Sequence, residues 1–347
     1  MKRKGKKMKS RKLHFIVSVM VLSFMSVGTA GALFDEVEGN WVAKVRDNKV
    51  RLKLTVFEDD DSWGEWSSSG SFERKDFQGL ELKKEANFKL QREAGTLVFN
   101  GTFKDSRGMG DFTFTPDNRF RSFLKEKGFD EISDKRMVSL SLQDVTKKYV
   151  NDLASIGLED LSISKLISFA VHDIGINYIK EIQKSGYEDI SPSKIISFRV
   201  HDIDIDYIKE LQELFSEISP SKIISFAVHE ITVDYVKNIQ KLGYRDISAS
   251  KVISFTVHDI DIDTIKGLQS LFDEIDPSKI ISFAVHDITT RYVKEIQAMG
   301  FEDISPSKII RFKVHDIDKN YIEYVQKLTK GKDLSASKII SLKVHGI

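Results

Sequence analysis

The sequence predicts an α+β multidomain protein, in which a small antiparallel all-β domain precedes an α-rich solenoid of 28–29-residue two-helix repeats. Two observations predict this fold class. Apolar residues alternate with polar ones between Trp41 and Pro116, and one motif then recurs at a nearly constant interval. A chain of 347 residues is long enough for two or three domains. We therefore expect a β domain over residues 33–116 and a solenoid of about seven to eight repeats over residues 117–347.

The first 32 residues have the composition of an export signal. They hold eight Lys or Arg and no acidic residue, and the basic stretch precedes the apolar run LHFIVSVMVLSFMSV. Ala30 and Ala32 then fit an A-x-A cleavage pattern. The segment predicts a cleaved signal peptide over residues 1–32 and a periplasmic or secreted protein. The alternative is an uncleaved anchor, since an apolar span of about 20 residues crosses a bilayer; only then would the protein contact the membrane.

The rest of the chain is mildly acidic and contains no cysteine. After residue 32 it holds 45 basic and 52 acidic residues, so nucleic acid is not an expected partner. The absence of cysteine excludes disulfides, thiolate metal sites and a lipid-modified cysteine. This composition is typical of a bacterial envelope or secreted protein that is stabilised by its core alone.

Residues 41–116 have the period of two that marks half-buried strands. In KVRLKLTVF, Val50, Leu52, Leu54 and Val56 share one face, and TLVFNGTF and DFTFTP repeat the pattern. Turn residues separate these runs at Asp47-Asn48, at 63–70, at Ala94-Gly95 and in DSRGMGD. The pattern predicts a meander of five to seven antiparallel strands, closed as a small barrel or sandwich.

Two tryptophans, Trp63 and Trp66, lie in the polar stretch DDDSWGEWSSSG. They form either an exposed aromatic binding platform or a cover over an open end of the sheet. We favour the cover.

Seven histidines mark the repeat. They lie 28 to 30 residues apart, at His172, His201, His229, His258, His286, His315 and His345. Gln143 takes this place in a diverged first copy, half a repeat precedes that copy, and another half repeat follows at the end of the sequence. A repeat of this size is typical of solenoids, because one repeat cannot bury its apolar face alone.

The second segment of each repeat predicts a helix. In DIDYIKELQEL, Asp204 is a good N-cap residue, and Tyr207, Ile208 and Leu211 form an apolar stripe. Where a left-handed residue often ends a helix, three of the repeats have glycine, namely Gly186, Gly243 and Gly300.

The first segment, SPSKIISFRVH, is ambiguous. Ser191 as N-cap and Pro192 in the first turn favour a helix, and Gly346 after the last histidine fits a helix end. However, Ile196, Phe198 and Val200 also alternate as they would in a strand. We favour two-helix repeats, and the alternative is a strand-helix solenoid similar to leucine-rich repeats.

The histidines predict a structural role. A metal site needs several ligands around one ion, whereas equivalent positions of a solenoid form a row with a spacing of about 10 Å. We expect each histidine to end its segment and cap backbone carbonyls. The chain also lacks the H-E-x-x-H, G-x-S-x-G, Walker and G-x-G-x-x-G motifs. We therefore expect no enzyme activity, no cofactor, and no catalytic, cofactor-binding or metal-binding residue.

Three elements in order resemble an extracytoplasmic region of some bacterial proteins. They are ANFKLQREAGTLVFNGTF, GMGDFTFTP and the repeated LGY-x-D-[IL]-S…H-x-I-[TD]. Some of those proteins are membrane metallopeptidase sensors of the beta-lactam-responsive regulator type, and others are exported proteins of unassigned function. The resemblance covers residues 37–347 and implies a sensing or interaction module outside the cytoplasm. It implies no catalytic residue, since this chain has neither the zinc helix nor the several membrane spans of the peptidase.

Together these observations predict an exported, non-enzymatic binding protein whose solenoid surface docks a protein or peptide partner. The candidate contact residues are those at the variable position of the first segment, together with the two tryptophans: Arg199, Ala227, Thr256, Ala284, Lys313, Trp63 and Trp66. The alternative is a small-ligand carrier or a hydrolase whose pocket lies in the β domain.

Overall fold

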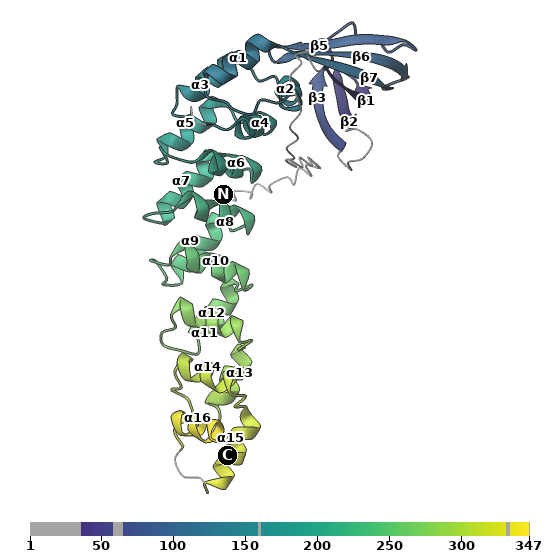
Figure 1. Ribbon diagram of the computed structural model, residues 1–347. Helices are drawn as coiled ribbons and strands as arrows, with labels where there is room; N and C mark the ends of the chain where they lie inside the picture. The colour runs from purple at the N-terminus through teal and green to yellow at the C-terminus, as the bar shows by residue number, and fades with distance from the viewer. Residues whose placement is uncertain (1–35, 58–64, 159–160, 331–333, 347) are drawn as a thin grey trace, which may run out of the picture. The chain divides into compact units, whose positions relative to one another are not determined.

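The computed structural model describes residues 36–57, 65–158, 161–330 and 334–346 (Figure 1). Contacts divide the chain into two compact units, Met1–Ile176 and Asn177–Ile347, and each unit is described separately below. Among the described residues, none of the helices combines the length and the apolar character that crossing a bilayer requires. The predicted signal peptide lies outside the described residues.

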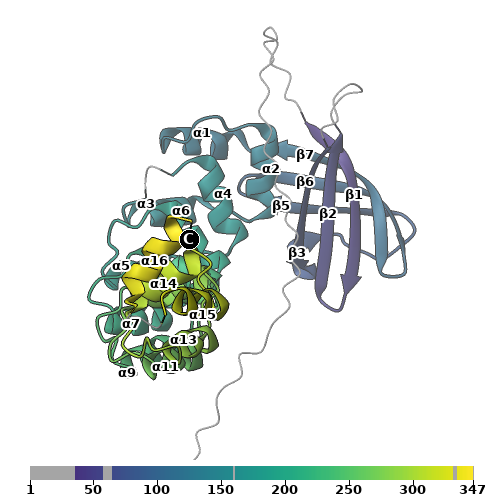
Figure 2. The ribbon, with the colours of Figure 1, turned by 90° about the horizontal axis from the view of Figure 1, so that it is seen from below.

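The N-terminal unit contains one curled antiparallel sheet of seven strands, a half-barrel rather than two stacked sheets (Figure 2). Its strands are β1 (Val37–Arg46), β2 (Lys49–Phe57), β3 (Glu65–Glu73), β4 (Phe77–Gln78), β5 (Ala86–Arg92), β6 (Gly95–Lys104) and β7 (Arg107–Pro116), with a short 3-10 helix, η1 (Arg74–Asp76), between β3 and β4. The order is β3-β2-β1-β7-β6-β5-β4, so β1 lies beside β7, and Val37 pairs with Phe114. The prediction of five to seven antiparallel strands is confirmed.

Trp41 lies at the centre of the core inside this sheet. Its side chain is 1% exposed and its indole N–H donates to the backbone carbonyls of Asn100 and Asp111, at 3.2 and 3.1 Å. The ring of Phe88 meets it edge-on, with centroids 5.2 Å apart. A Cβ on Gly101 would lie 2.8 Å from the indole ring, so glycine is needed there for the tryptophan to fit. The predicted inward face of β2, including Val50 and Leu54, is buried in the same core.

Four helices complete the N-terminal unit: α1 (Asn118–Glu126), α2 (Asp134–Leu142), α3 (Lys147–Ala154) and α4 (Ile163–Val171). Helix α2 packs against β6 and β7, and the buried Ser141 hydroxyl donates to the carbonyl of Gly95 at 3.4 Å. The backbone N–H of Lys147 donates to the carboxylate of Glu93 at 2.8 Å. Only Asp117 separates β7, which ends at Pro116, from α1, which begins at Asn118. Helices α2 and α3 are joined to the sheet by these packing and hydrogen-bond contacts.

The chain continues in two-helix repeats. Its helices are α5 (Ile176–Lys184), α6 (Pro192–Val200), α7 (Ile205–Leu214), α8 (Pro220–Val228), α9 (Val233–Lys241), α10 (Ala249–Val257), α11 (Ile262–Gln269), α12 (Pro277–Val285), α13 (Thr290–Gln297), α14 (Pro306–Val314), α15 (Lys319–Leu328) and α16 (Ala336–Val344). The first segment is a helix, so the strand-helix alternative is wrong. Ile195 and Phe198, three residues apart, are both fully buried while Val200 is 49% exposed, which is a helical period and not a period of two.

The helix ends lie where the capping residues predict. The side chain of Asp204 accepts the backbone N–H of Tyr207 at 2.7 Å, and Pro192 lies in the first turn of α6. Gly186 has a φ of +96° after α5, as a left-handed helix end requires. After each first helix the residue that follows the histidine is also left-handed, from Asp202 with a φ of +51° to Gly346 with a φ of +79°.

Equivalent helices of successive repeats pack against one another. In the C-terminal unit, contacts join α6, α8, α10, α12, α14 and α16 in sequence, and α7, α9 and α11 in a second row (Figure 1). Helices α6, α8, α10, α12 and α14 each bury an isoleucine or valine and a phenylalanine, as Ile223 and Phe226 on α8 illustrate. The core therefore runs continuously through the repeats of this unit.

Candidate functional site

The five candidate residues of the variable position lie at equivalent places near the ends of α6, α8, α10, α12 and α14. The guanidinium of Arg199 lies 5.8 Å from the ring centroid of Tyr178, and the ammonium of Lys313 lies 5.4 Å from that of Tyr292. Ala227, Thr256 and Ala284 are half-buried. The ammonium of Lys343, at the same position of α16, lies 4.3 Å from the ring centroid of Tyr321. In three repeats, therefore, the side chain at this position covers a tyrosine of the preceding repeat, a contact worth about 0.5–1 kcal/mol at an exposed site.

These tyrosines form a ladder between repeats. The hydroxyls of Tyr178, Tyr207 and Tyr292 donate to the backbone carbonyls of Ile203, Ile231 and Ile317, each at 2.7 Å. Tyr235 bonds the carbonyl of Ile260 in the same way, and in the N-terminal unit Tyr149 bonds that of Ile174. Burial raises the pKa of Tyr178, Tyr207 and Tyr235 to about 12, so these hydroxyls keep their donated proton at neutral pH. In α11 the equivalent residue is Thr264.

In α7, α9, α11, α13 and α15, a glutamine side chain donates a hydrogen bond to the preceding repeat, whereas the tyrosines bond to the following one. The side-chain amide of Gln212 donates to the carbonyl of Ser185 at 2.7 Å, and that of Gln269 to the carbonyl of Leu242 at 2.8 Å. Gln240, Gln297 and Gln326 make equivalent bonds to the preceding repeat. The recurring tyrosine and glutamine of the second helices thus join neighbouring repeats.

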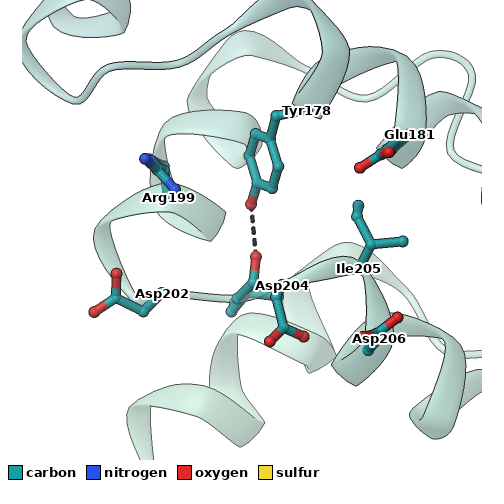
Figure 3. Close-up of a pocket in the computed structure, with 8 residues that line it drawn as sticks. Tyr178, Glu181, Arg199, Asp202, Asp204, Ile205 and Asp206 are labelled. Atoms are coloured by element: carbon teal, nitrogen blue, oxygen red, sulfur yellow. Dashed lines mark hydrogen bonds between the residues drawn. The ribbon is translucent and has the colours of Figure 1, made fainter.

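A shallow depression of about 320 Å³ surrounds Tyr178 (Figure 3). Arg199 lies on one side of the tyrosine, and Asp202, Asp204 and Asp206 follow one another along the turn below it. Asp204 caps α7, which gives it a structural function. Within the described residues, no three His, Asp or Glu side chains converge in a way that could hold a metal ion. The depression is thus lined by acidic side chains together with the basic Arg199.

The seven histidines each end a first helix. Their backbone N–H groups close the last helical turn, as that of His201 does on the carbonyl of Ser197 at 3.1 Å. The Nδ1 of His345 lies 2.7 Å from the carbonyl oxygen of Ser341, which is the capping contact that we expected of these rings. His201, His229, His258 and His286 are exposed. The histidines form a row, one in each repeat.

A row of exposed valines lies directly before these histidines. We call it the valine row, and in the C-terminal unit it comprises Val200, Val228, Val257, Val285, Val314 and Val344. These side chains are 49–56% exposed. Scattered apolar residues are ordinary on a surface, but a row at equivalent positions of packed helices forms one apolar stripe.

The left-handed residue after each histidine is acidic in five of the six repeat ends of the C-terminal unit: Asp202, Glu230, Asp259, Asp287 and Asp316. Their φ values lie between +51° and +53°, apart from +50° at Asp316. After glycine, asparagine and aspartate are enriched in this conformation, whereas glutamate is not. The helix end therefore accounts for a short polar side chain at the four aspartates, but it does not require a negative charge and does not account for Glu230.

The structure describes one of the two tryptophans that the sequence predicts as candidate contact residues. Trp63 lies outside the described residues, whereas Trp66 lies in β3 opposite Val56 of β2 and is half-buried. Trp66 therefore belongs to β3, an edge strand of the sheet.

The valine row and the recurring left-handed acids were not among the predicted site residues. The signal was in the sequence: at a period of 3.6, Val200 falls outside the arc of Ile195 and Phe198, although in a strand it would join Phe198. A strand would have buried these valines beside Phe198 and its equivalents, whereas the helix exposes them on the surface.

Comparisons of the chain with protein-family models, with curated proteins and with solved structures find no match. The geometry of the repeats is therefore the basis of the functional argument.

Proposed function

We propose that this protein is an exported, non-enzymatic interaction protein whose repeats dock a protein or peptide partner. The observation that most supports this function is the valine row, in which about half of each side chain is exposed at the same place in six successive repeats. These exposed methyl groups contribute less to the core than a buried side chain does. A partner that covered them would recover about 25 cal/mol for each Å² of apolar surface removed from water.

Small polar side chains form part of the remaining first-helix surface, beside basic residues such as Arg199. Ser193 is exposed on α6, and the hydroxyl of Ser197 donates to the carbonyl of Ser193 at 3.0 Å, an arrangement that recurs on α8, α10 and α12. Serine is a weaker helix former than alanine or lysine, so propensity does not favour it at these places. Short side chains leave the helix surface accessible to a partner backbone.

Site-specific photocrosslinking tests this function. A photoreactive amino acid at Val257, in an envelope extract from cells that make the protein, should yield a discrete crosslinked partner. The same amino acid at Lys237, which is exposed on the second helix α9, is the matched control and should not. Equal labelling from both positions, or none from either, would contradict docking on the first helices.

The alternative function, a small-ligand carrier or a hydrolase, has one observation in its favour. A depression of about 630 Å³ lies on the β domain between the turn after β1 and the segment around η1, and Arg74, Phe77 and Glu81 are among its lining residues. The core of the sheet itself is filled by aromatic side chains such as Trp41 and Phe99. Ligand-dependent hydrogen-exchange protection at residues 74–81, without change at the valine row, would favour the carrier.

Export and envelope sensing are part of the same proposal. They are supported by the basic and apolar composition of residues 1–32 and by the resemblance to extracytoplasmic sensor regions. The mature chain should begin near Leu33, which N-terminal sequencing or intact mass determines. A full-length chain in the membrane fraction would favour the anchor instead.

A further inference from the structure

We infer that the valine row binds an extended cationic peptide segment, whose basic side chains contact the acidic turns beside the valines. The acidic turns are the links between the first and second helices of the C-terminal unit, residues 201–207, 229–235, 258–264, 286–292 and 315–321. This inference rests on the proposed docking function and names the chemistry of the partner.

Charge is distributed unequally between the two sets of turns in this unit. The acidic turns contain eleven Asp or Glu and two Lys or Arg. The opposite links, from second helix to first (residues 185–194, 215–222, 242–251, 270–279 and 298–308), contain nine Asp or Glu and six Lys or Arg. One lysine in each opposite link, such as Lys194 or Lys222, recurs at the start of every first helix. Acidic residues thus outnumber basic ones in the turns at the valine end of the first helices, and Arg199 and Lys313 directly before Val200 and Val314 offset part of this charge.

Helix capping accounts for only part of this negative charge. Asp204 and Asp261 cap second helices, and the backbone N–H of Thr264 helps to lower the pKa of Asp261. By contrast, Asp202, Glu230 and Asp259 occupy left-handed positions that glycine fills without strain at Gly346. Acids that recur at such positions, next to exposed valines, are consistent with recognition of a cation.

The spacing of the repeats fits an extended peptide. Packed helices lie about 8–10 Å apart, so neighbouring valines of the row recur at about this interval. A polyproline II peptide advances about 3.1 Å per residue with three residues per turn, so every third side chain recurs after about 9.3 Å. One apolar and one basic residue in each triplet can therefore meet one valine and one acidic turn in each repeat.

A second copy of the same chain fits this surface less well. The valines and the acidic turns lie at the same end of each first helix, since Val257, His258 and Asp259 are consecutive. Antiparallel pairing of one valine row against another would therefore bring two sets of acidic turns together, and like charges would oppose that contact.

The binding test uses the full chain and a fluorescent peptide, (Pro-Lys-Leu)5, which spans about 46 Å in a polyproline II conformation. Fluorescence anisotropy should show saturable binding that weakens as salt rises from about 0.05 to 0.5 M, because exposed ion pairs are screened. Two peptides serve as controls, and neither (Pro-Glu-Leu)5 nor (Gly-Lys-Ser)5 should bind comparably.

Matched variants distinguish the effect of the acidic turns on peptide binding from the effect of the net charge of the protein. Glu230→Gln, Asp259→Asn and Asp287→Asn together remove three charges while asparagine still suits the left-handed backbone, and should weaken binding about tenfold. Glu217→Gln, Asp246→Asn and Glu302→Gln remove the same charge from the opposite links and should have less than a twofold effect. Val228→Ser, Val257→Ser and Val285→Ser together should weaken binding about tenfold, with an unchanged far-UV spectrum.

Three results would overturn the inference: no binding of (Pro-Lys-Leu)5, equal loss from the two charge variants, or no loss from the valine variant. Sedimentation should show the same mass for the wild type and the valine variant. A dimer that the valine variant dissociates would instead assign the row to a second copy. If Val257 still crosslinks to a partner while the cationic peptide does not bind, the docking function stands and the cationic class is wrong.

Discussion

The sheet and the repeats bury aromatic side chains in different ways. In the sheet the buried Trp41 lies at the centre of the core, and its indole N–H donates to the backbone carbonyls of Asn100 and Asp111, about sixty and seventy positions further along the chain. In the repeats Phe198, Phe226, Phe255, Phe283 and Phe312 fill equivalent places, each between neighbouring repeats. A defect in the sheet should therefore affect all of its strands, whereas a defect in a repeat should affect that repeat and its neighbours most.

The largest expected effect is from Trp41→Ala. It removes a fully buried ring and leaves two carbonyls without their donor, so we expect a loss of about 5 kcal/mol in the free energy of unfolding of the N-terminal unit. Denaturant melts followed by near-UV circular dichroism measure it. Val42→Ala, at a neighbouring side chain that is 48% exposed, is the control and should cost less than about 0.5 kcal/mol.

Phe226→Ala should be the next largest. Phe226 is fully buried in the middle of the array and meets the ring of Phe215 edge-on, with centroids 5.6 Å apart. Its truncation should cost about 4 kcal/mol. Hydrogen exchange should show lost protection in α8 and its neighbours, with the sheet unchanged. Equal loss of protection throughout the chain would contradict the nearest-neighbour description of the repeats.

Deletion of residues 335–347 should cost less than this single substitution. The deleted half repeat buries Ala336, Ile339 and Ile340, but the conformational entropy of thirteen residues offsets most of that gain, so we expect about 1–2 kcal/mol. Melts of the two variants compare them directly. A truncation that proves more damaging than Phe226→Ala would mean that the last helix acts as an essential cap.

The tyrosine ladder makes the repeats sensitive to alkali. The pKa of Tyr207 is about 12 in the folded chain against about 10 when unfolded, so the neutral hydroxyl is favoured by folding. Stability should therefore be complete below about pH 10 and fall as the pH rises through 12. Tyr207→Phe should cost about 1 kcal/mol at pH 7, since the carbonyl of Ile231 loses its donor, and should reduce the alkaline loss. Unfolding melts from pH 7 to 12 measure both, and Thr264→Phe, where no ladder bond exists, is the control.

The smallest expected effect is a gain. Asp202 has a φ of +51°, so Asp202→Gly should stabilise the repeats by about 0.5–1 kcal/mol, measured by thermal melts. Asp206→Gly, inside the first turn of α7, should lose about 0.5 kcal/mol instead. If Asp202→Gly destabilised the chain, the carboxylate would have a structural contact that outweighs the left-handed strain.

Much of this architecture could be predicted from the sequence, because short-range chemistry specifies it. Alternation placed Val50 and Leu54 inside a sheet, and capping residues such as Asp204 and Gly186 marked helix ends. The recurrence of one motif predicted packed repeats, because each repeat has an apolar face that only a neighbour covers.

The tertiary structure decided what period alone could not. Both helix and strand bury Phe198, but only the helix exposes Val200, and the contacts of neighbouring first helices select the helix. The pairing of β1 with β7, which curls the sheet, also depends on residues about seventy positions apart. Likewise, the partner of each ladder tyrosine is a carbonyl in the next repeat, as Ile203 is for Tyr178. A backbone carbonyl occurs at every residue, so no sequence pattern identifies which one the folded chain brings within reach of a hydroxyl.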